Sequence, residues 1–403
     1  MIRRLVLLPV LILSLLCQTG CWDRREVNEM SVVTGMAIDA GEIKKYKLTV
    51  EVINSPELNQ KKGGTAAPAI VYWREGDTIA ELAQKMNTGM TRELIFSHMR
   101  LLVISLDVAR EGLFDFFDYM ERSREVRNDF EIVLARKSSA ADVLQITYPV
   151  QKVPSMKLNT QMQTLKEEWG GDPDIRLEDM VISLMSPGRE PIMSIVRIRG
   201  SSEQGKSTGN MEKVSPDAFV FVDGLGVFRE DKYVGSLPVE DIPYVLLADN
   251  KLKQTVISAA CKEGVKEKFT VDLKETGAKI KMSVKNDIPQ IELSVEVEGQ
   301  LDGTECPDDL SKKNIYQSYE SRIETVLAQR LKSVIERVQS KYGSDIFGFG
   351  EEMNRQHHSY FKKVKGRWNV LFSKAAVSVK VNAKLRRAGL VTNTFKAVQK
   401  KEG

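Results

Sequence analysis

Residues 315–343, IYQSYESRIETVLAQRLKSVIERVQSKYG, form the longest helical pattern of the chain and decide the fold of its C-terminal part. Apolar residues recur at spacings of three, four and one from Ile315 to Tyr342, which places them on one stripe of a helix of about eight turns. Gly343 follows, a residue that commonly ends a helix. Because the stripe keeps no strict heptad, we expect it to pack on a sheet of its own domain; a coiled-coil seam is the alternative.

Strand patterns lie on both sides of this helix. Residues 255–299 are strand-rich, with apolar residues at every second position from 291 to 297. A second helix is predicted over residues 351–364, and residues 377–381 alternate as the last strand. The C-terminal part is therefore expected to be a sheet covered by a long amphipathic helix.

Strands and helices alternate in the first half of the chain. Residues 31–39 and 46–52 read as a hairpin, and a helix is expected from Ile79 to Met86. Residues 99–105 and 130–135 are apolar enough for strands buried on both faces, with a helix between them, so they should pair in parallel.

The clearest break in this pattern is the polar segment 201–215. We therefore expect a mixed α/β (α+β) fold, a three-domain body of mixed β-sheets packed by helices. Its parts would be an N-terminal mixed α/β domain (21–200), a small middle domain (216–253) and a C-terminal α+β domain (254–395) that carries the long amphipathic helix.

Residues 1–20 read as a lipoprotein signal peptide. Arg3 and Arg4 precede an apolar run of about a dozen residues, which is shorter than the roughly 20 that span a bilayer. Small residues then lead to Cys21, whose thiol can carry a diacylglyceryl group and whose freed amine can take a third acyl chain. An uncleaved signal anchor or a secreted protein with a chance cysteine are the alternatives.

Charge and cysteine content narrow the function classes. The formal net charge is +4, and no basic block is long enough to suggest nucleic-acid binding. Of the four cysteines, Cys261 and Cys306 remain after the signal and the lipid site are set aside. In an extracytoplasmic location these two could pair, or they could stay as two unpaired thiols.

The sequence predicts neither an enzyme nor a metal or cofactor site. His357 and His358 are adjacent on a predicted helix and point about 100° apart, so they cannot share a metal ion. His98 precedes a buried strand and is expected to make a structural hydrogen bond. The segment 224–229 begins like a dinucleotide-binding loop but lacks the third glycine, and two short strands explain it better.

Several stretches resemble the spore germinant receptor C subunits. They are residues 20–29 (GCWDRREVNE), 33–39 (VTGMAID), 97–104 (SHMRLLVI), 223–228 (DGLGVF) with 232–235 (KYVG), and 344–350 (SDIFGFG). The combination of the first and last stretches is specific, and the resemblance runs in order over essentially the whole chain.

The resemblance implies a three-domain lipoprotein on the outer face of the spore inner membrane. It would form a complex with two integral membrane subunits and be needed for the response to nutrients such as amino acids or sugars. Only Cys21 would have a chemical role. Trp22, Arg24 and Arg25 lie beside it as possible partner contacts, or as a solvated spacer that touches headgroups.

A lipid-anchored extracytoplasmic solute-binding protein is the alternative from another class. Such a protein needs a cleft between domains with convergent polar and aromatic groups. The sequence shows no such constellation, and it does not identify a nutrient.

Replacing Cys21 by Ala tests the lipid site directly. Without the thiol no diacylglyceryl group can be attached, so we expect the precursor to stay unlipidated and uncut after Gly20. Acyl labelling and membrane fractionation measure both effects. Unchanged labelling of the Cys21→Ala chain would show that the lipid is attached elsewhere.

Overall fold

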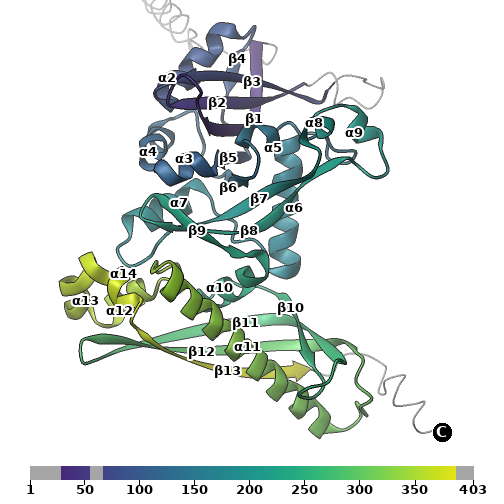
Figure 1. The fold of residues 1–403 in the computed structure, drawn as a ribbon, viewed down its shortest axis with the longest axis vertical. Helices are drawn as coiled ribbons and strands as arrows, with labels where there is room; N and C mark the ends of the chain where they lie inside the picture. The colour runs from purple at the N-terminus through teal and green to yellow at the C-terminus, as the bar shows by residue number, and fades with distance from the viewer. Residues whose placement is uncertain (1–28, 55–66, 387–403) are drawn as a thin grey trace, which may run out of the picture.

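Two β-sheets lie toward opposite ends of an elongated molecule in the computed structural model, which describes residues 29–54 and 67–386 (Figure 1). The first sheet has strand order β3-β2-β1-β5-β6-β7-β8-β9, with β4 beside β1. The second has order β10-β11-β12-β13. The expected mixed α/β architecture is confirmed.

The first sheet consists of β1 (Met30–Ala40), β2 (Tyr46–Ile53), β3 (Ala69–Gly76), β4 (Glu93–Ile95), β5 (Leu101–Ser105), β6 (Glu131–Arg136), β7 (Ile192–Gly200), β8 (Ala218–Arg229) and β9 (Lys232–Pro238). Its helices are α2 (Ile79–Met86), α3 (Leu106–Glu111), α4 (Phe114–Arg122), α5 (Ala140–Val143), α6 (Pro154–Trp169), α7 (Leu177–Met185), α8 (Ser202–Gly205) and α9 (Gly209–Glu212). The next helix, α10 (Ile242–Ala248), follows β9 and packs against elements of the second sheet.

The C-terminal elements are β10 (Thr255–Ala260), β11 (Lys268–Lys285), β12 (Ile288–Thr304), α11 (Lys313–Lys341), α12 (Phe349–Gln356), α13 (His358–Val364), α14 (Trp368–Phe372) and β13 (Ala376–Arg386).

Both faces of the first sheet are covered, as the apolar strands predicted. The hairpin of β1 and β2 is antiparallel, and β5 and β6 pair in parallel. Alternate residues of β5 enter opposite cores: Leu101 and Val103 pack with α5 and α6, whereas Leu102 and Ile104 pack with α3 and α4. A strand buried in this way has no polar face, which explains its unbroken apolar sequence.

The first sheet continues past the polar segment 201–215. This segment forms α8 and α9, and β8 then returns antiparallel to β7. Residues 216–253, expected as a small middle domain, add β8 and β9 to the sheet, because β7 supplies backbone hydrogen-bond partners along β8. The segment 224–229 belongs to this one strand and not to two short ones. The three-domain division stays a prediction.

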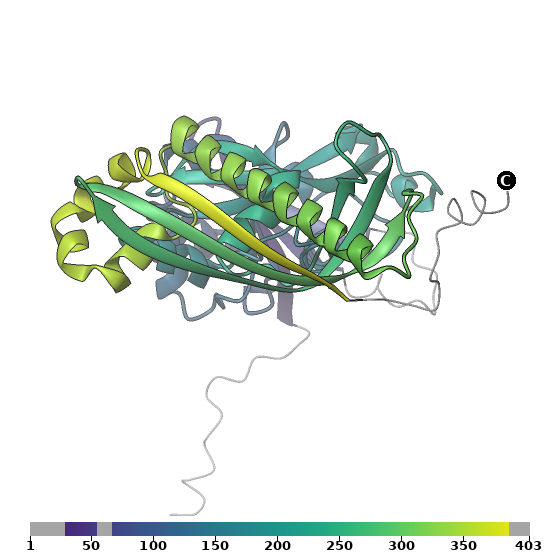
Figure 2. The same cartoon turned by 90° about the horizontal axis from the view of Figure 1, so that it is seen from below.

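The long helix α11 lies across the second sheet, and its apolar stripe is buried there (Figure 2). The stripe therefore faces the sheet of its own domain, as expected, and no coiled-coil partner is needed. Gly343 follows the helix with φ +56°, the left-handed conformation that glycine adopts at low cost. Cys261 and Cys306 form a disulfide, which settles the alternative left open by the sequence.

The helix expected over residues 351–364 is broken at His357. The His357 backbone leaves the helical region (φ −137°, ψ 55°), and its Nε2 lies 2.8 Å from the carbonyl oxygen of Met282. Gln356 also bonds the backbone of β11, so contacts with the hairpin compete with helix continuity. His98 lies exposed before β5, so the expected role as a structural histidine of a buried strand is wrong.

Two buried carboxyl groups meet between β6 and the segment after α6. Glu131 hydrogen-bonds Asp172, and Asp172 accepts a hydrogen bond of 2.7 Å from the Ser194 hydroxyl. Burial first, and then the neighbouring Asp172 charge, raises the pKa of Glu131 well above its ordinary value. Two carboxyl groups can hydrogen-bond to each other only when one of them is protonated, so the pair shares a proton.

Replacing Glu131 by Gln tests this pair through the pH dependence of stability. A carboxyl group whose pKa is raised by folding adds stability below its unfolded pKa, and this stability is lost as the pH rises through the folded pKa. We expect the urea concentration at the unfolding midpoint of the wild-type chain to decrease as the pH rises above about 4.3, the ordinary pKa of Glu. The fall should be smaller in Glu131→Gln, because its amide keeps a donor beside Asp172 and has no proton to lose.

The exposed Glu212 provides the control, as Glu212→Gln. Identical pH slopes for the wild type and both variants would show that Glu131 and Asp172 do not share a proton.

Candidate functional site

The site residues expected from the sequence are Cys21, Trp22, Arg24 and Arg25. All four lie outside the described residues. The lipid attachment at Cys21 and the partner contacts of the other three therefore stay predictions. No helix within residues 29–54 and 67–386 combines the length and the apolar composition needed to cross a bilayer.

The stretch 344–350 lies where the two sheets join, and its centre is the fully buried carboxylate of Asp345. The carboxylate accepts hydrogen bonds from the backbone N–H groups of Phe347 (3.1 Å), Phe349 (3.2 Å) and Gly350 (2.7 Å), and from Trp368 Nε1 (2.8 Å). Burial raises the pKa of Asp345 to about 6. With four donors, Asp345 fixes the turn that opens α12 and attaches α14 to it.

The turn forms part of the hydrophobic core. Phe347 and Phe349 are buried with ring centroids 5.2 Å apart, and both rings lie near Phe372. A Cβ atom on Gly350 would lie 2.5 Å from the Cα atom of Gly188, so the chain before β7 touches the turn directly. The second glycine of the stretch thus permits a close approach between the two halves of the molecule.

Arg189 connects three segments at this junction. Its guanidinium bonds both carboxylate oxygens of Asp249, at 2.9 and 2.6 Å, and its Nε donates to Glu351 at 2.7 Å. The neighbouring Glu190 accepts from the Asn369 side chain and from the backbone N–H of Glu230. These contacts join the segment before β7 to α10, α12 and α14.

The stretch 223–235, in β8 and β9 of the first sheet, also contributes to this junction. A Cβ atom on Gly235 would lie 2.3 Å from the Tyr342 ring, and the Tyr342 hydroxyl donates to the Ser236 carbonyl at 2.6 Å. Arg229 donates to the Tyr342 carbonyl. The end of α11 is therefore held against β8 and β9 by residues of this stretch.

A groove of about 610 Å³ lies beside these contacts. Its lining comes from the start of α4, residues 183–191, Glu230 and residues 365–370. Three large apolar side chains on the lining are exposed, namely Phe114 (49%), Met185 (77%) and Val370 (58%). The groove is thus a hollow of mixed polarity at the junction of the two sheets, with three exposed apolar side chains on its lining, and we call it the junction groove.

The junction network was not found from the sequence. Arg189, Asp249, Glu351 and Trp368 come from four distant segments, and only the fold brings them together. One local signal was present: residues 187–191 read Pro-Gly-Arg-Glu-Pro, a charged pair held between residues that break strands and helices.

A second hollow lies at the carboxyl ends of β5 and β6. Because α3 and α5 leave these strands toward opposite faces, this is where open α/β sheets bind ligands. Two of its three cations are already paired, Arg136 with Asp223 (3.0 Å) and Arg110 with Asp107 (2.6 Å), and the third, Lys137, is exposed. The buried Ser138 hydroxyl has no partner, but one hydroxyl is too little to hold a solute.

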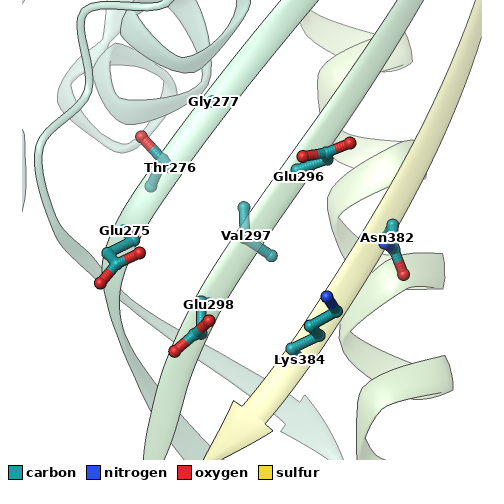
Figure 3. Close-up of a pocket in the computed structure, with 8 residues that line it drawn as sticks. All are labelled: Glu275, Thr276, Gly277, Glu296, Val297, Glu298, Asn382 and Lys384. Carbon is teal, nitrogen blue, oxygen red and sulfur yellow. The ribbon is translucent and has the colours of Figure 1, made fainter.

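A third hollow lies on the polar face of the second sheet, where Glu275, Glu296 and Glu298 stand on neighbouring strands near Lys384 (Figure 3). Glu298 forms an ion pair with Arg386. Across residues 29–54 and 67–386, no group of three or more His, Cys, Asp or Glu side chains is placed to hold a metal ion. We interpret this hollow as part of the open polar face of the sheet.

Comparison with known proteins gives two family matches that follow each other along the chain. The family described as "Spore germination protein N-terminal domain" matches residues 23–198. The family described as "Spore germination B3/ GerAC like, C-terminal" matches residues 223–389. Together they cover most of the sequence, and the junction described above joins residues of both, such as Arg189 of the first match and Glu351 of the second.

Individual relatives match over nearly their full length. Spore germination protein KC of Bacillus subtilis (strain 168) is 28% identical over 98% of this chain and 98% of its own. Spore germination protein B3 of the same organism is 24% identical over 95% and 97%. The crystal structure of the GerBC protein has the same fold, with a TM-score of 0.56, 20% identity, and coverage of 87% of this chain and 96% of that chain.

Replacing Phe347 by Ala tests whether the 344–350 turn is a structural element. Removing a fully buried phenylalanine should lower the free energy of unfolding by about 3 kcal/mol. Urea denaturation measures this, and the half-exposed Phe114 provides a matched control as Phe114→Ala, with a much smaller loss. If Phe347→Ala left stability unchanged, the turn would not be part of the core.

Proposed function

The chain belongs to the spore germination protein family to which these two matches assign it, and from this premise we propose that it is a lipid-anchored, non-catalytic subunit of a nutrient germinant receptor. Cys21 carries the lipid, which holds the body on the outer face of the spore inner membrane. Two integral membrane subunits are its partners. The protein is needed for the germination response to nutrients.

One observation carries this proposal, namely where two of the stretches that resemble the C subunits lie. Residues 344–350 and 223–235 both lie at the junction between the sheets. Asp345 binds its own turn and Trp368, while Arg229 and Gly235 contact Tyr342 at the end of α11, two residues before the turn. Residues of a catalytic site would instead keep polar groups free for a substrate. These stretches fix the position of the part that carries the second sheet relative to the part that carries the first. A body held in one shape in this way is suited to assembly with partner proteins, which supports the proposal.

The proposed lipid at Cys21 fits this role. A tether raises the local concentration of the body beside membrane partners, so modest protein contacts can suffice for binding.

The solute-binding alternative finds less support in the geometry. At the junction groove, the polar groups of Arg189, Glu190 and Trp368 are bonded within the protein. At the second hollow, Arg110 and Arg136 are paired.

A solute site needs convergent polar groups that are free to bind the solute. The charged groups left free on the lining of the junction groove are the side chains of Lys365, Arg367 and Glu230, which stand beside exposed apolar side chains, so the groove resembles a protein-binding surface more than a solute site.

Co-expression with the two integral membrane subunits tests the proposal. We expect the lipidated full-length chain to be recovered with a tagged membrane subunit from a detergent extract. Calorimetry of the chain alone with candidate nutrients, such as L-alanine or glucose, should show no saturable heat.

Two results would contradict the proposal. Recovery of neither membrane subunit would rule out a stable receptor complex, and saturable micromolar binding of a nutrient to the chain alone would favour the solute-binding alternative.

A further inference from the structure

The junction groove carries an apolar surface that the fold leaves uncovered. Phe114 begins α4, Met185 ends α7 and Val370 lies in α14, yet all three side chains line one groove. Single exposed apolar side chains are normal on a protein surface. Their convergence from three elements that are far apart in sequence is typical of a site that binds another molecule.

Cations lie along one wall of this groove. Residues 362–367 read Lys-Lys-Val-Lys-Gly-Arg, and Lys365 and Arg367 line the groove. None of the four cations in this segment forms an ion pair within the described residues, and all four are exposed. Of the two acids on the lining, Glu190 is bonded to Asn369 and to the backbone of Glu230, which leaves the Glu230 carboxylate as the opposing charge. The wall therefore favours an anionic occupant.

Both walls of the groove are fixed before anything binds. Gly188 lies against Gly350, and the Arg189 guanidinium bonds Asp249 and Glu351. A preformed site avoids the free-energy cost of ordering its walls on binding. The groove is therefore suited to a binding partner without a prior change of shape.

We propose that the junction groove binds an amphipathic acidic segment of a partner protein, one that inserts an apolar side chain beside Phe114, Met185 and Val370 and places carboxylates on Lys365 and Arg367. The proposal rests on the proposed function, because a receptor subunit would supply this segment. The concave shape favours a chain segment over a membrane, since a bilayer surface is flat on this scale and cannot fill a hollow of about 610 Å³.

Variants on the groove test this proposal in the full-length lipidated chain, co-expressed with its two membrane subunits. Two are used: Met185→Glu, and the double variant Lys365→Glu with Arg367→Glu. These side chains are exposed, so the thermal melts should match that of the wild type. We expect each variant to lower recovery of the tagged membrane subunit by roughly tenfold, the loss typical of a replaced interface anchor.

Val214→Glu is the matched control, because Val214 is a fully exposed apolar side chain between α9 and β8, at the end of β7 and β8 opposite the groove. Its recovery should equal that of the wild type. A photo-crosslinker at position 370 should join the chain to a segment of a membrane subunit that carries Asp or Glu beside apolar residues.

The outcomes separate this inference from the proposed function. If the wild type recovers the membrane subunits and both groove variants do so equally well, the inference is wrong while the proposed function stands. If the wild type recovers neither subunit, both fail. The inference is also wrong if position 370 crosslinks to lipid, because the occupant is then a membrane surface.

Discussion

The arrangement of the two halves depends on the buried carboxylate of Asp345. Four donors converge on it, three from the backbone of its own turn and one from Trp368. Leaving such donors buried without an acceptor costs about 1–3 kcal/mol each, so the turn has few alternatives. This one side chain directs Phe347 and Phe349 into the core and brings Gly350 against Gly188.

The fixed junction has a consequence for function. Arg189 and Glu190 belong to the half that carries the first sheet, and their partners Glu351 and Asn369 belong to the other half. Because the halves are held together, the exposed apolar side chains of α4, α7 and α14 keep a constant spacing across the junction groove. A tethered body with a preformed surface is suited to assembly with membrane partners, which is the role that we propose for this member of the spore germination family.

The sequence predicted elements whose pattern is local and missed contacts that depend on the fold. The stripe of α11, the hairpin of β1 and β2 and the parallel pairing of β5 with β6 follow from apolar periodicity and were confirmed. The break at His357 was missed because its cause is a bond to Met282 on a distant strand. The Arg189 network was missed for the same reason, since its partners are up to 162 residues away.

Hydrogen exchange of backbone amides tests the central claim, that the junction is one cooperative unit. In the wild type, the amides of residues 347–350 and 189–190 should exchange slowly. In Asp345→Ala, both segments should exchange faster together, while the amides of β5 and β6 stay protected. Faster exchange confined to residues 347–350 would contradict the claim, because the turn would then open without releasing the other half.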